Sequence, residues 1–142
     1  MTEDAFAIVI AFHPDMATLA ELCELLSRDA EVIVVDNTPD VCAPLALRNV
    51  SCISMSGNAG IAAAQNVGIR SALQRGAKTI AFFDQDSTPG EPLLPTLIAA
   101  LGLPPRGVVA PICVDARTGD EYPPFRFNRW GWATPISVMG KH

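Results

Sequence analysis

The sequence predicts an α/β protein with a Rossmann-like three-layer fold around a mostly parallel sheet. Short apolar runs rich in β-branched residues alternate along the chain with longer segments whose apolar residues recur at helical spacing. The short runs are continuously apolar, as in strands buried on both faces of a parallel sheet. Several of them end in polar residues, at the place where ligands bind in open α/β sheets. With 142 residues, the chain is expected to form a single domain.

The first half of the chain is expected to contain three strands and one helix. Residues 5–12 and 31–35 form short, mainly apolar runs that predict strands, and residues 50–54 are expected to form a short third strand. Between the first two runs, residues 15–28 place five apolar side chains on one helical face, with Asp15 as a favourable N-cap. These five are Met16, Leu19, Leu22, Cys23 and Leu26.

The second half begins with an alanine-rich segment, residues 57–75, that predicts a helix. Asn58 is in place to cap the start of this helix, and Gly76 is in place to end it. The remaining expected elements, in chain order, are a strand at 79–83, a helix at 91–101, a strand at 107–114, a turn at 115–120 and an extended segment at 122–127.

Composition and charge exclude several classes of protein. The net charge is −5 and Lys and Arg form no block, so the sequence lacks the basic surface of a nucleic-acid-binding protein. The longest apolar run, residues 5–12, is too short to span a bilayer, and acidic residues precede it where a secretory signal is basic. The four cysteines lack C-x-x-C spacing, and the two histidines have no partner at zinc-ligand spacing. These features favour a cytoplasmic protein with reduced thiols.

The strongest functional signal is the strand at residues 79–83, which runs directly into Asp84, Gln85 and Asp86. Residues two apart in extended backbone point to the same side, so both carboxylates can face one ligand. Carboxylate oxygens suit Mg²⁺ or Mn²⁺, ions that are usually held by one or two carboxylates together with substrate phosphates. The competing interpretation is a solvated turn, because Asp, Ser, Pro and Gly all favour turns.

Polar residues also follow the first two predicted strands: His13 and Asp15 after the first, Asp36 and Asn37 after the second. Three strand ends that meet at one edge favour a nucleotide-binding crevice, in which Asp36 would accept a hydrogen bond from a base or a ribose hydroxyl. An Asx turn is the alternative role for Asp36. The sequence lacks the glycine-rich phosphate motif of dinucleotide-binding folds and also lacks that of P-loop proteins. A metal ion is therefore expected to bind the diphosphate.

Three segments in the same order resemble the donor-binding half of family 2 inverting glycosyltransferases, which have the glycosyltransferase-A fold. They are Val34-Val35-Asp36-Asn37, the segment from Gly57-Asn58-Ala59-Gly60 to Ile69, and Phe83-Asp84-Gln85-Asp86-Ser87. The Asp-Gln-Asp-Ser variant is most similar to the bacterial rhamnosyltransferase branch. The resemblance covers nearly the whole chain, to about Trp132. It implies transfer of rhamnose or a related sugar from a nucleotide diphosphate to a bacterial surface glycan.

The resemblance also implies roles for individual residues. Phe12, His13 and Asp36 would contact the base and ribose of a dTDP- or UDP-linked sugar. The residues that would shape the donor pocket beside the diphosphate are Asn58, Gly60 and Asn66. Asp84 and Asp86 match the D-x-D motif, in which the second carboxylate reaches Mn²⁺ or Mg²⁺ and the first reaches the sugar nucleotide. We therefore expect Asp86 and Asp84 to form the metal site.

Members of the family continue past the segment that resembles residues 107–132 into an acceptor-binding half, which carries the general base for the acceptor hydroxyl. The carboxylates that follow Asp86 do not resemble that base in their setting, so no catalytic residue is assigned. These carboxylates are Glu91, Asp115, Asp120 and Glu121. The chain alone is therefore expected to bind the donor without transferring sugar to a glycan acceptor.

Three interpretations stay open beside this one. The chain can instead be a non-catalytic nucleotide-sugar-binding remnant or partner subunit. A haloacid-dehalogenase-like phosphatase also matches residues 84–88, but the one lysine that follows is Lys141. The basic, aromatic stretch at 126–132 is compatible with contact to an acceptor, to the inner face of the cell membrane or to a second copy of the chain, and also with local packing.

Overall fold

The computed structural model describes residues 4–39, 45–102, 107–115, 117–122, 125–127, 129 and 132–135. The chain divides into two compact units, Met1–Ala99 and Ala100–His142. Each unit is described by itself, and the expectation of a single domain stays a prediction. Of the helices in the described ranges, none has the length and apolar character needed to cross a membrane.

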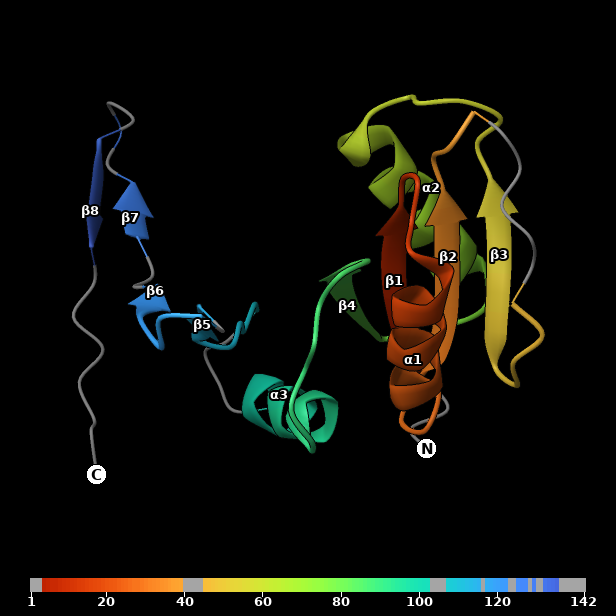
Figure 1. The fold of residues 1–142 in the computed structure, drawn as a ribbon. Helices are drawn as coiled ribbons and strands as arrows, with labels where there is room; N and C mark the ends of the chain where they lie inside the picture. Colours follow the sequence, from red (N-terminus) through yellow and green to blue (C-terminus); the bar gives the residue numbers. More distant parts are fainter. Residues whose placement is uncertain are drawn as a thin grey trace. The chain divides into compact units, whose positions relative to one another are not determined.

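A four-stranded parallel sheet forms the centre of the first unit (Figure 1). Its strands are β1 (Ala5–Ala11), β2 (Glu31–Asp36), β3 (Val50–Ser54) and β4 (Thr79–Asp84), in the spatial order β3-β2-β1-β4. In this register, Ala11 lies opposite Asp36 on one side of β1, and Ile10 lies opposite Asp84 on the other. The carboxyl ends of β1, β2 and β4 therefore lie side by side, as the sequence predicts.

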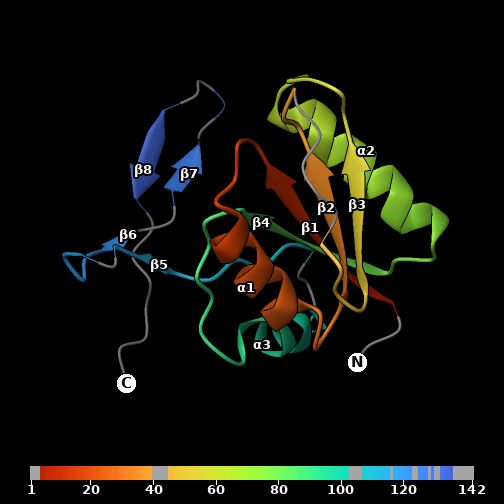
Figure 2. The same ribbon diagram turned by 45° about the vertical axis from the view of Figure 1, so that its right-hand side comes forward.

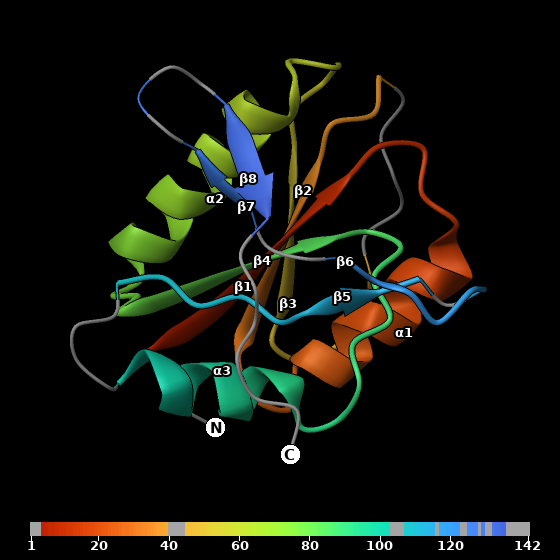
Figure 3. The same cartoon turned by 90° about the vertical axis from the view of Figure 1, so that its left-hand side faces the viewer.

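Helices cover both faces of this sheet, as Figure 2 and Figure 3 show. Helix α1 (Met16–Leu26) and helix α3 (Leu93–Leu101) contribute Leu22 and Leu94 to the core cluster on one face. Helix α2 (Ile61–Gln74) contributes Ala64 and Ala72 to the cluster on the other face. Successive residues of β1 alternate between the two clusters, which explains why the strand is apolar throughout. The predicted three-layer α/β fold is confirmed.

The predicted start of helix α1 is confirmed, because Oδ1 of Asp15 accepts a hydrogen bond from the backbone N–H of Thr18 at 2.9 Å. The predicted start of α2 at Asn58 is wrong. The helix begins at Ile61, and its N-cap residue is Gly60, whose φ of 85° lies in the left-handed region that favours glycine. No side chain caps the first turn of α2, so its N–H groups remain available to an anionic ligand.

The second unit contains two short antiparallel hairpins. β5 (Cys113–Val114) pairs with β6 (Glu121–Tyr122), and β7 (Phe125–Phe127) pairs with β8 (Ala133–Pro135). The predicted strand at 107–114 is wrong for residues 107–112, which have irregular backbone. Pro111 lies in that run and has no N–H to donate to a neighbouring strand. The predicted turn after Val114 is confirmed, since Asp115 N donates to the carbonyl of Asp120 at 2.9 Å.

Candidate functional site

A cavity of about 300 Å³ opens at the carboxyl ends of β1, β2 and β4. Its lining combines apolar side chains with three side-chain amides and one carboxylate, a composition typical of small-molecule sites. The lining residues are Ile10, Phe12, Asn37, Asn58, Ile61, Asp84 and Gln85. The structure thus brings together three residues that the sequence analysis assigned to a site, namely Phe12, Asn58 and Asp84.

Asn37 joins β2 to the loop that precedes α2. Its side chain is buried, with 3% of its surface exposed. Nδ2 of Asn37 donates to Oδ1 of Asn58 at 3.1 Å, and Oδ1 of Asn37 accepts from Ala59 N at 2.9 Å. Oδ1 of Asn58 also accepts from Gly60 N at 2.9 Å. These bonds hold Asn58 at the cavity wall, which is the role it has in place of a helix cap.

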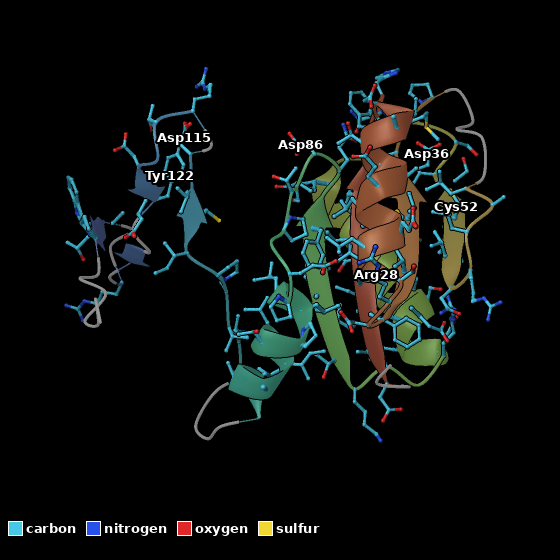
Figure 4. The ribbon with its side chains drawn as sticks, turned by 60° about the horizontal axis from the view of Figure 1, so that its bottom comes forward. Arg28, Asp36, Cys52, Asp86, Asp115 and Tyr122 are labelled. Carbon is cyan, nitrogen blue, oxygen red and sulfur yellow. The ribbon has the colours of Figure 1, made fainter. Side chains whose placement is uncertain are left out.

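Asp36 ends β2 beneath this region and is fully buried, with 0% of its surface exposed. Oδ1 of Asp36 accepts from Thr38 N at 3.0 Å, which is the Asx-turn contact that the sequence analysis left open. Oγ1 of Thr38 accepts in turn from His13 N at 3.0 Å. Asp36 therefore supports the loop after β1. Figure 4 shows Asp36 and Asp86 at the same end of the sheet, with Arg28 farther from that end.

The end of β1 presents two aromatic side chains. The rings of Phe12 and His13 meet edge to face, with centroids 4.5 Å apart. Phe12 is 42% exposed. His13 has a φ of 47°, in the left-handed region that non-glycine residues adopt rarely. An exposed aromatic face at a cavity wall is a surface on which a planar base can stack.

Asp84 and Asp86 are both exposed, and Asp84 lines the cavity. The carbonyl of Asp84 accepts from Ser87 N at 3.0 Å, so the chain turns directly after the strand. The expectation of extended backbone through Asp86 is therefore wrong, and Asp86 is not among the residues that line the cavity. Over the described ranges, no group of three or more His, Cys, Asp or Glu side chains could hold a metal ion. Two carboxylates fit the way Mg²⁺ and Mn²⁺ are usually bound, because those ions take their other ligands from substrate phosphates and water. The donor set therefore fits such an ion when a diphosphate is present.

The two other residues expected at the site occupy different positions. Gly60 immediately precedes Ile61, which lines the cavity, and the N–H of Gly60 is engaged with Asn58. Asn66 is exposed on α2 and is absent from the residues that line the cavity. Gly60 thus lies next to the cavity wall, and the role of Asn66 at the donor stays a prediction.

Gln85 is the site residue whose role the sequence analysis missed. Its side-chain amide makes two hydrogen bonds to the backbone of Phe12: Phe12 N donates to Oε1 at 2.6 Å, and Nε2 donates to the Phe12 carbonyl at 3.1 Å. The sequence feature that could have pointed to Gln85 is its position between two carboxylates, Asp84 and Asp86. An alternating pattern of side chains does not show this role, because the chain turns directly after Asp84 and Gln85 lines the cavity beside it.

Two of the acidic residues that follow Asp86 are engaged in local contacts. Oδ1 of Asp115 accepts from Arg117 N at 2.7 Å and from Thr118 N at 3.2 Å, and Oδ2 accepts from the Tyr122 hydroxyl at 3.1 Å (Figure 4). These bonds, with the Arg117 N–H first, hold the pKa of Asp115 below its ordinary value of 3.8. Glu91 forms an ion pair with Arg28. Asp115 is thus a turn residue rather than a base poised to take a proton.

The fold and the cavity together define an α/β protein with a cavity at the carboxyl ends of parallel strands, the place where ligands bind in open α/β sheets. The profile of the family described as "Glycosyl transferase family 2" matches residues 7–137. The chain belongs to this family. The "dTDP-rhamnosyl transferase RfbF" of Shigella flexneri is 30% identical over 142 aligned residues, which cover 97% of this chain and 48% of that protein. The chain thus spans about half the length of this curated relative. No solved structure gives a significant match.

Proposed function

We propose that this chain binds the nucleotide-sugar donor of a glycosyltransferase that transfers rhamnose or a related sugar to a bacterial surface glycan. The observation that carries the proposal is the cavity at the ends of β1, β2 and β4, whose lining combines the Asp84 carboxylate with three asparagine or glutamine amides in a chain of this family. The similarity to a protein named as a dTDP-rhamnosyl transferase favours dTDP over UDP as the nucleotide.

The donor is proposed to lie across the three strand ends. The base would stack at Phe12 and His13, while Asp36 would accept a hydrogen bond from the base or the ribose at the floor of the site. The diphosphate would lie between the first turn of α2 and the pair Asp84 and Asp86, close to Asn58 and Gly60 in the loop before that turn. A bound Mn²⁺ or Mg²⁺ would stabilise the negative charge that develops on the departing nucleoside diphosphate.

A second candidate is a donor-binding subunit that does not itself catalyse transfer. It is favoured by the local contacts of Asp115 and Glu91, because neither carboxylate is then assigned as the general base. The phosphatase alternative is not retained, because the chain belongs to glycosyl transferase family 2.

Further partners also belong to the proposal. We propose that the protein is cytoplasmic and binds a glycan acceptor. Residues 126–132 would contact the inner face of the membrane or a second copy of the chain. Of that stretch, residues 128, 130 and 131 lie outside the described residues. Trp132 is 73% exposed and is the described side chain best placed for such a contact.

Calorimetric titration with dTDP, UDP and GDP, each with and without Mn²⁺, tests the proposal. We expect dTDP to bind most tightly and Mn²⁺ to increase its affinity by about tenfold or more, because the two carboxylates hold the ion against the diphosphate. GDP is the matched control, since it carries the same diphosphate on a different base. Absence of binding by all three nucleotides in the presence of Mn²⁺ would contradict the proposed function.

A further inference from the structure

The contact between Gln85 and Phe12 continues the pairing of β4 and β1 beyond the two strands. Ile10 lies opposite Asp84 at the end of the backbone ladder. A glutamine side chain carries one N–H donor group and one carbonyl acceptor, as a peptide unit does. At 2.6 Å and 3.1 Å, both are used on the backbone of Phe12. The side chain of Gln85 therefore takes the place of the next peptide unit of β4.

This contact is not required to hold the sheet together. β1 and β4 already pair along six residue pairs, from Ala5 opposite Thr79 to Ile10 opposite Asp84. The two bonds from Gln85 are at an exposed position, where water competes for the same groups and the net contribution to stability is small. Their main effect is local: they fix Phe12 relative to the carboxylates on either side of Gln85.

The backbone at the end of β1 is held from both sides. Phe12 is bonded to Gln85, and the next residue, His13, donates its N–H to Oγ1 of Thr38. His13 has a φ of 47°, which an isolated chain rarely adopts at a non-glycine residue. Surrounding contacts must therefore maintain the conformation in which the Phe12 ring lines the cavity with the His13 ring packed against it.

We infer that Gln85 is a positioning residue that holds the aromatic pair Phe12 and His13 at a fixed distance from Asp84 and Asp86. This inference rests on the proposed function, in which the aromatic pair receives the base and the carboxylates receive the metal and diphosphate. A ligand that contacts both the aromatic pair and the carboxylates gains affinity from their fixed spacing, because the protein need not order these side chains on binding. A ligand that reaches only one place does not gain in this way.

The test compares three ligands on four proteins. Wild type, Gln85→Met, Gln85→Glu and Gln74→Met are titrated with dTDP plus Mn²⁺, with thymidine, and with pyrophosphate plus Mn²⁺. Calorimetry measures the tight complexes, and ligand-observed NMR measures the weak ones. Gln85→Met keeps the length of the side chain and removes both hydrogen bonds. Gln74→Met makes the same change at an exposed position of α2 away from the cavity.

We expect Gln85→Met to weaken dTDP–Mn²⁺ binding by about tenfold, while thymidine and pyrophosphate–Mn²⁺ bind as in wild type. Gln85→Glu keeps an acceptor for the N–H of Phe12 and loses the donor to its carbonyl, so an intermediate loss is expected. Gln74→Met should match wild type with every ligand. The thermal midpoints of all variants should agree within about 2 °C, because the sheet does not depend on this contact.

Each other result overturns a defined part of the interpretation. Wild-type affinity for dTDP–Mn²⁺ in Gln85→Met means that Gln85 does not position the site, although the proposed function stands. Equal loss for all three ligands, or a large drop in the thermal midpoint, means that Gln85 has a structural role instead. Failure of the wild-type protein to bind dTDP–Mn²⁺ removes the proposed function and this inference together.

Discussion

Gly68 of α2 lies directly against Ile8 of β1. A Cβ atom at Gly68 would lie 2.6 Å from Cγ2 of Ile8 and 3.3 Å from Cγ2 of Val35. Both neighbours are fully buried, and their β-branched side chains have few alternative rotamers. The absence of a side chain at Gly68 therefore sets how closely α2 approaches the sheet, and hence where its first turn lies relative to the cavity.

Gly68→Ala is expected to lower the free energy of unfolding by about 1–2 kcal/mol. Alanine favours a helix by about 1 kcal/mol over glycine, but overpacking a dense core costs about 1–3 kcal/mol, and the stiff neighbours put this site at the costly end. Urea unfolding followed by circular dichroism measures the change. Gly90→Ala is the matched control, because a Cβ there meets no atom within 4 Å. Equal stability of the two variants would refute the close-packing interpretation.

Asp86→Asn is expected to weaken Mn²⁺-dependent dTDP binding by tenfold or more, about 1.4 kcal/mol. The substitution keeps the shape of the side chain and removes the charge that holds the ion. Glu21→Gln, on the exposed face of α1, changes the net charge by the same amount and should bind as wild type does. Asp84→Asn should have a smaller effect, since an amide still accepts a hydrogen bond from the nucleotide. Full Mn²⁺-dependent binding by Asp86→Asn would exclude the D-x-D assignment.

Asp36→Asn separates the two roles of this buried carboxylate. An asparagine Oδ1 can still accept from Thr38 N, so the turn should survive. If Asp36 serves the nucleoside, dTDP affinity should fall while pyrophosphate–Mn²⁺ binding stays unchanged. Calorimetry with both ligands measures the difference. Equal losses for both ligands would indicate that Asp36 is a structural turn residue or belongs to the metal site.

Cys23 should give stability a measurable dependence on alkaline pH. Burial, and to a smaller extent the Cys52 thiol, raise the pKa of Cys23 from 9.0 to about 11. Between these values the unfolded chain has lost the thiol proton and the folded chain has kept it, so stability falls as the pH rises from about 9 to about 11. Urea unfolding across this range should show the fall in wild type and in the exposed-thiol control Cys113→Ala. A fall of the same size in Cys23→Ala would contradict the assignment.

The layers of the fold could be predicted because β1, β2 and β4 are short, mainly apolar runs, α1 has a clear apolar face and α2 is an alanine-rich segment. The start of α2 could not be predicted. Asn58 has the residue type of a helix cap, but its partner is Asn37, which is 21 residues away in the sequence. Residues 107–112 have the composition of a strand, yet composition does not show whether backbone groups will find a neighbouring strand to pair with.

The candidate site shows the same division. The carboxylates of Asp84 and Asp86 could be placed at a strand end from local sequence alone. The contact between Gln85 and Phe12 spans 73 residues, and it depends on β4 lying next to β1. Chain order does not fix that neighbour, because β4 follows β3 in the sequence but lies at the opposite edge of the sheet.

The position of β4 at that edge also determines when the cavity can form during folding. β1, β2 and β3 can begin to pair as soon as the first three strands have been synthesised. The other edge of β1 stays unpaired until β4 docks, and parallel pairing between segments distant in the sequence is slow. Phe12 meets Asp84 and Gln85 only after this last strand has docked. Pairing of β1, β2 and β3 alone would therefore leave the cavity incomplete, so the appearance of ligand binding during refolding would report that β4 has paired with β1.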